Sequence, residues 1–410
     1  MRPLKGGIKL EGKKDATLIP WSSARPSPPK KVRFPLSNQS LPVFHDFNSP
    51  GLTPGYRPLV QTGDHVRLGE KIAESDQKIG LHASVSGKVA EINSVIEILS
   101  DGKDEPITQF IPRGINWESL SKDELKQTLS DSGIELPVKE SPKTLILNAC
   151  ESEPYLTSDH SLLMSHPVEI LKAAEILLKV FEAKNVILVL EDNKEEVAEV
   201  MKSKIFFHTW SKTRVEVLPT RYPQEDETIL ISTFAQGERA CVLDMATVYA
   251  VYEAVVLQKP FYERIVTISG ECVAQPRNFW IRIGTSAEDA VKYARGFLRK
   301  PEKVILGGPM RGTLTPNLSV PVLKDTRAIL GLPRELTRPE SIEPCIRCNR
   351  CVESCPVDLS PVMITLASER GLFDLTREYD SHLCIECGNC SYVCPAKRPM
   401  VELIQYANER

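Results

Sequence analysis

The sequence comprises 410 residues, enough for about two to four domains, and its 41% hydrophobic and 26% charged residues are typical of a folded globular protein, not a disordered chain. Because 51 Lys and Arg residues are balanced by 54 Asp and Glu residues, the formal net charge is only −3, which argues against nucleic-acid binding. No apolar run approaches the roughly 18 residues of a membrane-spanning helix and no secretory signal precedes the first domain, so we expect a protein that stays in the cytoplasm or on the cytoplasmic face of a membrane.

The first 50 residues or so are rich in Pro and Gly, and basic residues outnumber acidic ones within the first 35. One interpretation is a solvated strap that lies over the next domain. The other is a docking segment for anionic lipid headgroups or for an acidic partner.

Residues 58–98 predict short strands separated by glycine turns, with the sequences Thr62–Val66 and Ala83–Val89 on either side of a hairpin. This pattern resembles the barrel-sandwich hybrid fold of lipoyl and biotinyl carrier domains. The hairpin tip, Glu74–Lys78, lacks the carrier motif, so we expect Lys78 to be an ordinary surface lysine.

From about residue 140 to 260, strands and helices alternate. Strands are predicted at Thr144–Asn148, Val186–Leu190 and Arg214–Leu218, and helices around Ile170–Phe181 and Lys194–Lys202. Such alternation with short connections predicts a mostly parallel sheet with helices on both faces.

Short β segments return at Ile265–Gly270, Phe279–Gly284 and Lys303–Met310, which predicts a small mixed β domain. A connector rich in Pro and Arg, Leu332–Pro339, then leads to the part of the chain that carries most of its cysteines.

Eight of the eleven cysteines fall into two copies of C-x2-C-x2-C-x3-C-P, the spacing of ferredoxins that hold two 4Fe-4S clusters. The isolated Cys150, Cys241 and Cys272 are expected to be small buried hydrophobic residues. The residues between the two motifs include a predicted helix, Pro361–Arg370.

In this arrangement three thiolates of one motif and the fourth thiolate of the other motif hold each cluster. The rule assigns one cluster to Cys345, Cys348, Cys351 and Cys394, and the other to Cys384, Cys387, Cys390 and Cys355. Two structural zinc sites are the alternative, but the repeated x3-C-P ending argues against them. The module by itself predicts electron transfer.

With these motifs in place, the whole chain resembles the C subunit of the Rnf electron transport complex, a membrane-bound ferredoxin:acceptor oxidoreductase that moves Na+ or H+. The resemblance is carried in order by the following tracts: Gly6–Ile8, His82–Gly87, Asn148–Asp159, Val266–Thr285, Gly307–Met310, Pro321–Lys324 and both cysteine motifs. It implies a multidomain α/β protein with four parts. These are an N-terminal strap and barrel-sandwich hybrid (1–110), an α/β domain similar to the flavin subunit of complex I (115–260), a β-grasp-like SLBB domain (262–325) and a dicluster ferredoxin domain (335–410).

Members of that family usually bind FMN and NADH in the α/β domain through a loop of the form G-x-G-G-A-G-F-P-x-x-x-K, whose bare backbone amides surround phosphate. Here the corresponding stretch, Asp131–Lys139, lacks those glycines and is shorter. Glu225 and Asp226 replace two further glycines, and Asp244 replaces an asparagine. Because ionised carboxylates repel an anionic cofactor, we expect the NADH and FMN site to be lost.

Glu151 and Glu153 follow the strand Thr144–Asn148 and precede a helix, where open α/β sheets bind ligands. They are either carboxylates that stabilise the helix N-terminus or retained contacts to FMN or NADH.

The resemblance implies a peripheral electron-transfer subunit on the cytoplasmic side of the cell membrane, within an ion-translocating oxidoreductase (a translocase). It would relay electrons through two 4Fe-4S clusters, with other Rnf subunits and a ferredoxin or other redox protein as partners, without an NADH dehydrogenase activity of its own. The alternatives are an active NADH- and FMN-binding Rnf subunit and a soluble ferredoxin-domain reductase accessory protein. The coupling ion and the direction of electron flow do not follow from the sequence.

Overall fold

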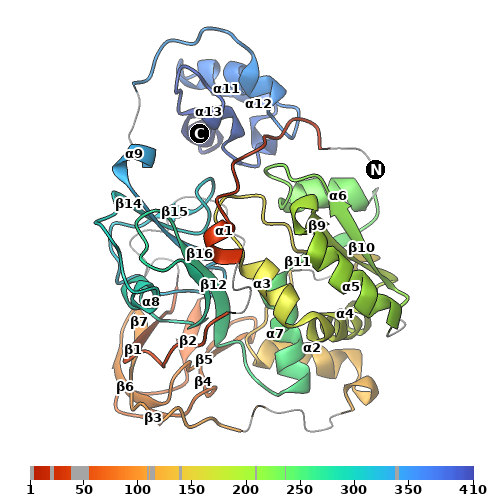
Figure 1. The fold of residues 1–410 in the computed structure, drawn as a ribbon, viewed down its shortest axis with the longest axis vertical. Coiled ribbons are helices and arrows are strands. Elements are labelled where there is room, and N and C mark those ends of the chain that lie inside the picture. The colour runs from red at the N-terminus through yellow and green to blue at the C-terminus, as the bar shows by residue number, and fades with distance from the viewer. Residues whose placement is uncertain are drawn as a thin grey trace.

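The computed structural model describes residues 4–18, 23–37, 55–108, 110, 116–137, 141–207, 210–235, 237–337 and 341–410. Parts of the expected strap, Lys139 of the shortened loop and the end of the expected connector lie outside these residues. A helical module that carries the cysteines lies across one end of two larger lobes, an α/β lobe and a β lobe (Figure 1).

The N-terminal part of the β lobe consists of two sheets, as the carrier-like pattern predicts. The first sheet runs in the order β1 (Lys31–Pro35), β7 (Val95–Ser100), β6 (Gly87–Ile92), β3 (His65–Val66), and the second in the order β2 (Tyr56–Pro58), β4 (Lys71–Ser75), β5 (Gly80–His82). Alternate residues such as Val32, Phe34, Ile96 and Ile98 point into the core. Lys78 is exposed in the turn between β4 and β5, as expected.

The α/β lobe contains the predicted parallel sheet. Its order is β10 (Thr213–Leu218), β9 (Asn185–Glu191), β8 (Thr144–Asn148), β11 (Ala240–Asp244), and every pair of neighbours is parallel. Leu145 and Leu147 pack on one face, while Ile146 between them packs on the other. Helices therefore cover both faces, as the alternation predicts.

One face of this sheet is covered by four helices: α2 (Lys122–Asp131), α4 (Pro167–Phe181), α5 (Glu195–Phe207) and α7 (Met245–Val256). The other face is covered by α6 (Glu227–Phe234), and α3 (Ser158–Ser165) follows the loop after β8. Helix α5 begins one residue later than predicted, because Lys194 belongs to a preceding 3-10 turn, and it continues to Phe207.

The rest of the β lobe is the predicted mixed β domain. Its sheet runs in the order β13 (Arg277–Arg282), β12 (Glu263–Ser269), β16 (Ala328–Leu332), β14 (Lys303–Leu306), β15 (Thr313–Leu314), with α8 (Ala287–Tyr293) beside it. Strand β14 is shorter than the predicted run to Met310. The chain leaves the sheet at Gly307, whose φ of +100° suits glycine, and continues toward the α/β lobe and the cysteine module.

The cysteine module is built from short helices. They are α10 (Arg350–Glu353), α11 (Pro361–Ser368), α12 (Phe373–Glu378), α13 (Asn389–Tyr392) and α14 (Met400–Asn408), and α9 (Arg334–Thr337) lies in the connector. The predicted helix between the motifs is α11, which packs against α12 and α14.

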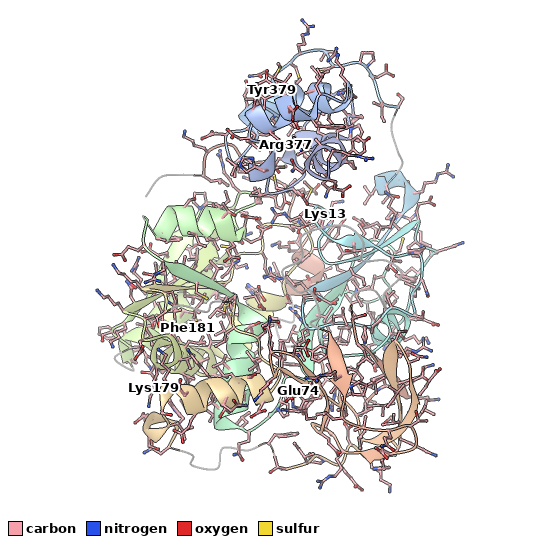
Figure 2. The ribbon with its side chains drawn as sticks, turned by 180° about the vertical axis from the view of Figure 1, so that it is seen from behind. Lys13, Glu74, Lys179, Phe181, Arg377 and Tyr379 are labelled. Atoms are coloured by element: carbon pink, nitrogen blue, oxygen red, sulfur yellow. The ribbon has the colours of Figure 1, made fainter. Side chains whose placement is uncertain are left out.

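The N-terminal segment, residues 4–18 with α1 (Asp15–Leu18), runs between the cysteine module and the two lobes (Figure 1). The amide of Gly7 donates to the carbonyl of Ser354 at 3.1 Å, and Ile8 exchanges two backbone hydrogen bonds of 2.9 Å with Tyr222. Figure 2 shows Lys13 near the middle of the molecule, where its ammonium pairs with Glu271 at 3.0 Å. The described part of the strap therefore joins the module to both lobes.

Gly87→Ala is expected to destabilise the β lobe, because a Cβ at this position would overlap the carbonyl oxygen of Leu99 in the paired strand. We expect a loss of about 2–4 kcal/mol, measured by thermal unfolding. Gly63→Ala is the matched control, since Gly63 also has a positive φ but a Cβ there meets nothing within 4 Å. Equal losses in the two variants would show that backbone strain alone, and not the contact with Leu99, requires Gly87.

Candidate functional site: two groups of cysteines beside the end of a parallel sheet

Four cysteines, one from the first motif and three from the second, surround one cavity. Cys355, Cys384, Cys387 and Cys390 line it together with apolar side chains that include Val401 and Ile404. We call these cysteines the inner group, because Cys355, Cys387 and Cys390 are buried and Cys384 is partly buried. The structure thus brings Cys355 to the three cysteines with which the spacing rule pairs it.

The remaining four cysteines, the outer group, are Cys345, Cys348, Cys351 and Cys394. Cys351 and Cys394 belong to one buried apolar cluster, which also contains Met400 and Cys390 of the inner group, whereas Cys348 is exposed to solvent. The amide of Glu343 donates to the carbonyl of Ala396 at 2.9 Å, which holds the start of the first motif beside the end of the second.

Backbone amides point at the sulfur atoms in the same way in both motifs. The amide of Arg347 donates to Sγ of Cys345, and the amide of Glu386 donates to Sγ of Cys384, each at 3.4 Å. Arg347 and Glu386 both have a positive φ, as do the residues two positions later, Asn349 and Gly388. These left-handed positions curl each motif around its sulfurs, so that amide dipoles face the negative charge of a thiolate.

The inner group fits a metal-sulfur cluster. Burial raises the pKa of Cys384 to about 11 and that of Cys387 to about 12, so these thiols become thiolates only when a metal replaces their protons. Four cysteine sulfurs around one cavity are the donor set of a 4Fe-4S cluster.

The second cysteine loop is fixed to both lobes by buried and partly buried side chains. The hydroxyl of Tyr222, just after β10, donates to the carbonyl of Cys387 at 2.6 Å. The guanidinium of Arg311, from the β lobe, donates to the carbonyl of Ile385 at 2.6 Å. Asn389 donates to the carbonyls of Tyr222 and Ser354 at 3.4 and 3.2 Å. The inner group therefore lies directly beside the carboxyl end of the parallel sheet.

Glu151, which follows β8 at this end of the sheet, has its hydrogen-bonding capacity satisfied within the protein. Its carboxylate accepts from the amides of Asp159 (2.8 Å) and His160 (3.1 Å) at the start of α3, and from the ammonium of Lys194 (2.9 Å). Burial alone would raise the pKa of Glu151, but Lys194 and Lys14 hold it at about 2. This geometry matches the helix-terminus interpretation of Glu151.

Glu153 faces a different segment. Its carboxylate accepts from the amide of Met310 at 2.7 Å, and it lies so close to Gly308 that a Cβ at that position would overlap its Oε2. Burial raises the pKa of Glu153, and the amide of Met310 opposes that effect. Glu153 thus connects the end of the sheet to the β lobe, at the turn that also places Arg311.

Glu225, one of the two acidic residues that replace family glycines, also lies at the carboxyl end of the sheet. Glu225 accepts a hydrogen bond from the hydroxyl of Ser152, and its carbonyl accepts from the side chain of Asn148 at 2.8 Å. Burial raises the pKa of Glu225 to about 8, and the neighbouring Glu153 and Glu191 add to the effect. The carboxyl groups of Glu153, Glu191 and Glu225 are therefore gathered at the ends of β8, β9 and β10.

Asp244, at the end of β11, caps helix α7. Its carboxylate accepts from the amides of Ala246 (3.1 Å) and Thr247 (3.2 Å) and from the hydroxyl of Thr247 (2.6 Å). Burial would raise the pKa of Asp244, but Arg264 and Arg327 keep it below the usual value. An ionised side chain of the protein thus occupies a helix N-terminus that could otherwise bind an anion.

The described part of the shortened loop, residues 131–137, packs against the β lobe. A Cβ at Gly133 would lie 2.5 Å from the carbonyl oxygen of Gly80, and the carbonyl of Gly133 accepts from the ammonium of Lys324 at 2.6 Å. Gly133, the one glycine in residues 131–137, therefore forms a contact between domains. Together with Glu225, this arrangement does not fit a phosphate-binding loop.

The sequence interpretation did not identify Lys14, Lys194, Tyr222 or Arg311 as important side chains. Lys194 and Lys14 are buried beside Glu151, and Tyr222 and Arg311 contact the second cysteine loop. Tyr222 stands shortly before the replaced glycines and Arg311 directly follows the Gly307–Met310 tract, so proximity to the tracts that carry the family resemblance was the available signal.

Comparisons with known proteins agree with these features. Four family models match: RnfC barrel sandwich hybrid domain (3–107), Nuo51 FMN-binding domain (132–249), SLBB domain (265–314) and 4Fe-4S dicluster domain (344–397). The expected fold class is thereby confirmed. Within the part of the chain that the structure describes, no helix is both long and apolar enough to span a membrane.

Named relatives cover most of the chain. It is 34% identical to the C subunit of the proton-translocating ferredoxin:NAD(+) oxidoreductase complex of Clostridium ljungdahlii, over 99% of this chain and 93% of that one. It is 32% identical to the Na(+)-translocating counterpart of Acetobacterium woodii, over 85% and 86% of the two chains. Among solved structures, an NAD+-reducing [NiFe]-hydrogenase aligns with a TM-score of 0.48 and 18% identity, covering 62% of this chain and 54% of that one.

Lys194→Met is expected to lower the free energy of unfolding by about 3–5 kcal/mol, because it removes the ammonium that forms ion pairs with the buried carboxylates of Glu151 and Glu191. Chemical denaturation measures the loss. Lys292→Met, which removes an exposed cation paired with Asp289 at 2.9 Å, is the control and should cost about 0.5 kcal/mol or less. A loss in Lys194→Met no larger than in the control would contradict the assigned role.

Glu225→Gln is expected to raise the free energy of unfolding above that of the unsubstituted protein. The difference should grow as the pH rises from about 4.5 to 8. The folded-state pKa of about 8 lies above the ordinary 4.5, so over this range the unfolded chain ionises Glu225 while the folded protein keeps it protonated, and the folded protein loses stability as the pH rises. We expect the advantage of the variant to grow by more than about 1 kcal/mol between these limits. Denaturation at both pH values measures it, with exposed Glu402→Gln as control. A pH-independent difference would show that folding does not raise the pKa of Glu225.

Proposed function

The chain belongs to the family of C subunits of Rnf-type ion-translocating oxidoreductase complexes, and from this premise we propose that it relays electrons through two 4Fe-4S clusters within such a complex. The complex is an oxidoreductase that couples ferredoxin-linked electron transfer to translocation of Na+ or H+, and this chain is its peripheral electron-transfer subunit. The observation that supports the proposal is the cavity that one cysteine of the first motif and three of the second line together, in a part of the chain that matches a 4Fe-4S dicluster domain.

The ligand sets we propose are the inner group, Cys355, Cys384, Cys387 and Cys390, and the outer group, Cys345, Cys348, Cys351 and Cys394. A bound 4Fe-4S cluster supplies one-electron transfer. The thiolates bind it, the amides of Arg347 and Glu386 face the sulfurs, and apolar side chains such as Ile404 exclude water from the inner site. The exposed Cys348 gives the outer site access to a redox partner, while the inner site faces the α/β lobe.

We also propose that this chain holds neither FMN nor NADH. The Nuo51 match places the chain in a fold that serves flavin proteins, but the residues at the end of the sheet favour another use. Gly133 packs against Gly80, Asp244 caps α7, and Glu225 presents a carboxyl group beside Glu153. In this proposal Glu151 fixes the start of α3, Glu153 joins the end of the sheet to the β lobe, and neither contacts a cofactor.

The partners that follow from this function are the other subunits of the complex and a ferredoxin or similar redox protein. The names of the relatives make them components of larger assemblies. We propose that the chain binds on the cytoplasmic side of the membrane through those partners.

Anaerobically purified protein is expected to contain about eight irons and eight sulfides per chain, the content of two 4Fe-4S clusters, and no flavin. Dithionite should bleach its visible absorbance, whereas NADH should not. Stoichiometric FMN with bleaching by NADH would instead identify an active NADH-linked subunit. A content of zinc without sulfide would refute the cluster assignment.

Serine variants test the two ligand sets within the same experiment. Cys355→Ser and Cys387→Ser should abolish the same paramagnetic signal of the reduced protein, and Cys351→Ser and Cys394→Ser should abolish the other. Cys150→Ser is the control, because this buried cysteine packs beside Ile146 in the α/β lobe, and it should retain both signals. Pairing of Cys355 with Cys351 would contradict the exchange of the fourth ligand between motifs.

A further inference from the structure

Arg311 lies directly against the loop that carries most of the inner group. It leaves the β lobe at the turn after β14, and its guanidinium donates to the carbonyl of Ile385, the residue after Cys384, at 2.6 Å. Its side chain is 28% exposed, so its charge is only partly screened by water. The loop that holds Cys384 and Cys387 thus has a fixed positive charge against its backbone.

Arg311 lies close to the sulfurs of this loop, because the carbonyl that it bonds belongs to Ile385, between Cys384 and Cys387 in the chain. A positive charge that stabilises a thiolate also stabilises the additional negative charge that a cluster on these thiolates gains on reduction.

Arg311 is held by Asp226, one of the two acidic residues in the place of family glycines. The guanidinium and carboxylate are 2.8 Å apart, and the Asp226 side chain is 11% exposed. Asp226 also caps α6 by accepting from the amide of Thr228 at 2.9 Å, so its position is fixed by the α/β lobe. The pair is therefore a dipole with its positive end against the cysteine loop and its negative end at the start of α6.

We propose that the Arg311–Asp226 pair sets the electron affinity of the inner cluster, with Arg311 favouring the reduced state and Asp226 limiting that effect. This inference rests on the ligand set proposed above. It gives Arg311 and Asp226 the role of positioning residues that act through the cysteine loop. It also gives the two clusters different electrostatic surroundings, since Arg311 bonds to the motif that supplies three of the four inner cysteines.

Substitutions of Arg311 and of Asp226 should shift the electron affinity of the inner cluster in opposite directions. Arg311→Gln should lower the electron affinity of the inner cluster by about tenfold, the order expected for one charge at about 10 Å with an effective dielectric constant of about 20. Tenfold corresponds to about 59 mV for a one-electron couple. Asp226→Asn keeps a helix cap but frees the charge of Arg311, and should raise the affinity. Arg311→Lys keeps the charge and should remain near the unsubstituted protein.

The measurement is a potentiometric titration of the full-length, cluster-loaded protein followed by paramagnetic resonance, with the signals assigned by the serine variants. The outer cluster in each sample is an internal control. Arg377→Gln is the external control, because Arg377 lies on α12, pairs with Asp374 at 2.8 Å and is 56% exposed (Figure 2). It should move neither signal.

Opposite shifts of the inner signal in Arg311→Gln and Asp226→Asn, with a fixed outer signal, would support the proposal. Shifts of the same sign, equal shifts of both clusters, or no shift would overturn it. If Arg311→Gln loses iron, Asp226→Asn and Arg311→Lys still decide between these outcomes. Absence of an inner signal from the unsubstituted protein would refute the ligand set instead, which separates failure of the proposed function from failure of this inference.

Discussion

The attachment of the second cysteine loop to the carboxyl end of the parallel sheet is the constraint on which the remaining geometry depends. Buried carbonyl groups require donors, and those of Ile385 and Cys387 find them in Arg311 and Tyr222, which come from different lobes. The N-terminal segment strengthens the same attachment, because Gly7 bonds to Ser354 of the cysteine module and Ile8 bonds to Tyr222 of the α/β lobe. The inner cysteines are thereby held against the two lobes, while the outer group includes the solvent-exposed Cys348.

The charged residues at the end of the sheet follow from this attachment. An open α/β sheet presents strand ends and helix N-termini where ligands ordinarily bind. In this chain Glu151 accepts from the start of α3, Asp244 caps α7, and Asp226 caps α6 while holding Arg311. Each of these side chains bonds to amides or cations with which an anionic cofactor would otherwise interact. The fold of a flavin domain is thus compatible with a structural and electrostatic role for the same strand ends.

Much of the fold could be predicted from the sequence. The alternation of apolar runs located β8, β9 and β10 within one or two residues, because Leu145 and Leu147 and the residue between them all face covering helices. Less predictable was the end of β14. The run from Lys303 to Met310 has the composition of a strand, but Gly307 turns the chain so that Met310 and Arg311 can reach Glu153 and the cysteine loop. The glycines mark the turn, but which residues of other domains the turn reaches depends on contacts that the local sequence does not show.

The sequence by itself determined the family, the domain types and the two cysteine motifs, since these depend on local spacing and on the order of short tracts. Only the tertiary structure decided what surrounds each group. Glu151 and Glu153 look equivalent in sequence, yet one meets Lys194 and the start of α3 and the other meets the amide of Met310. Arg311 and Tyr222 gave no signal of their own. The reason is physical: burial and charge pairing are set by residues far apart in the chain, and these determine which carboxylates ionise and which cation faces the cysteine loop.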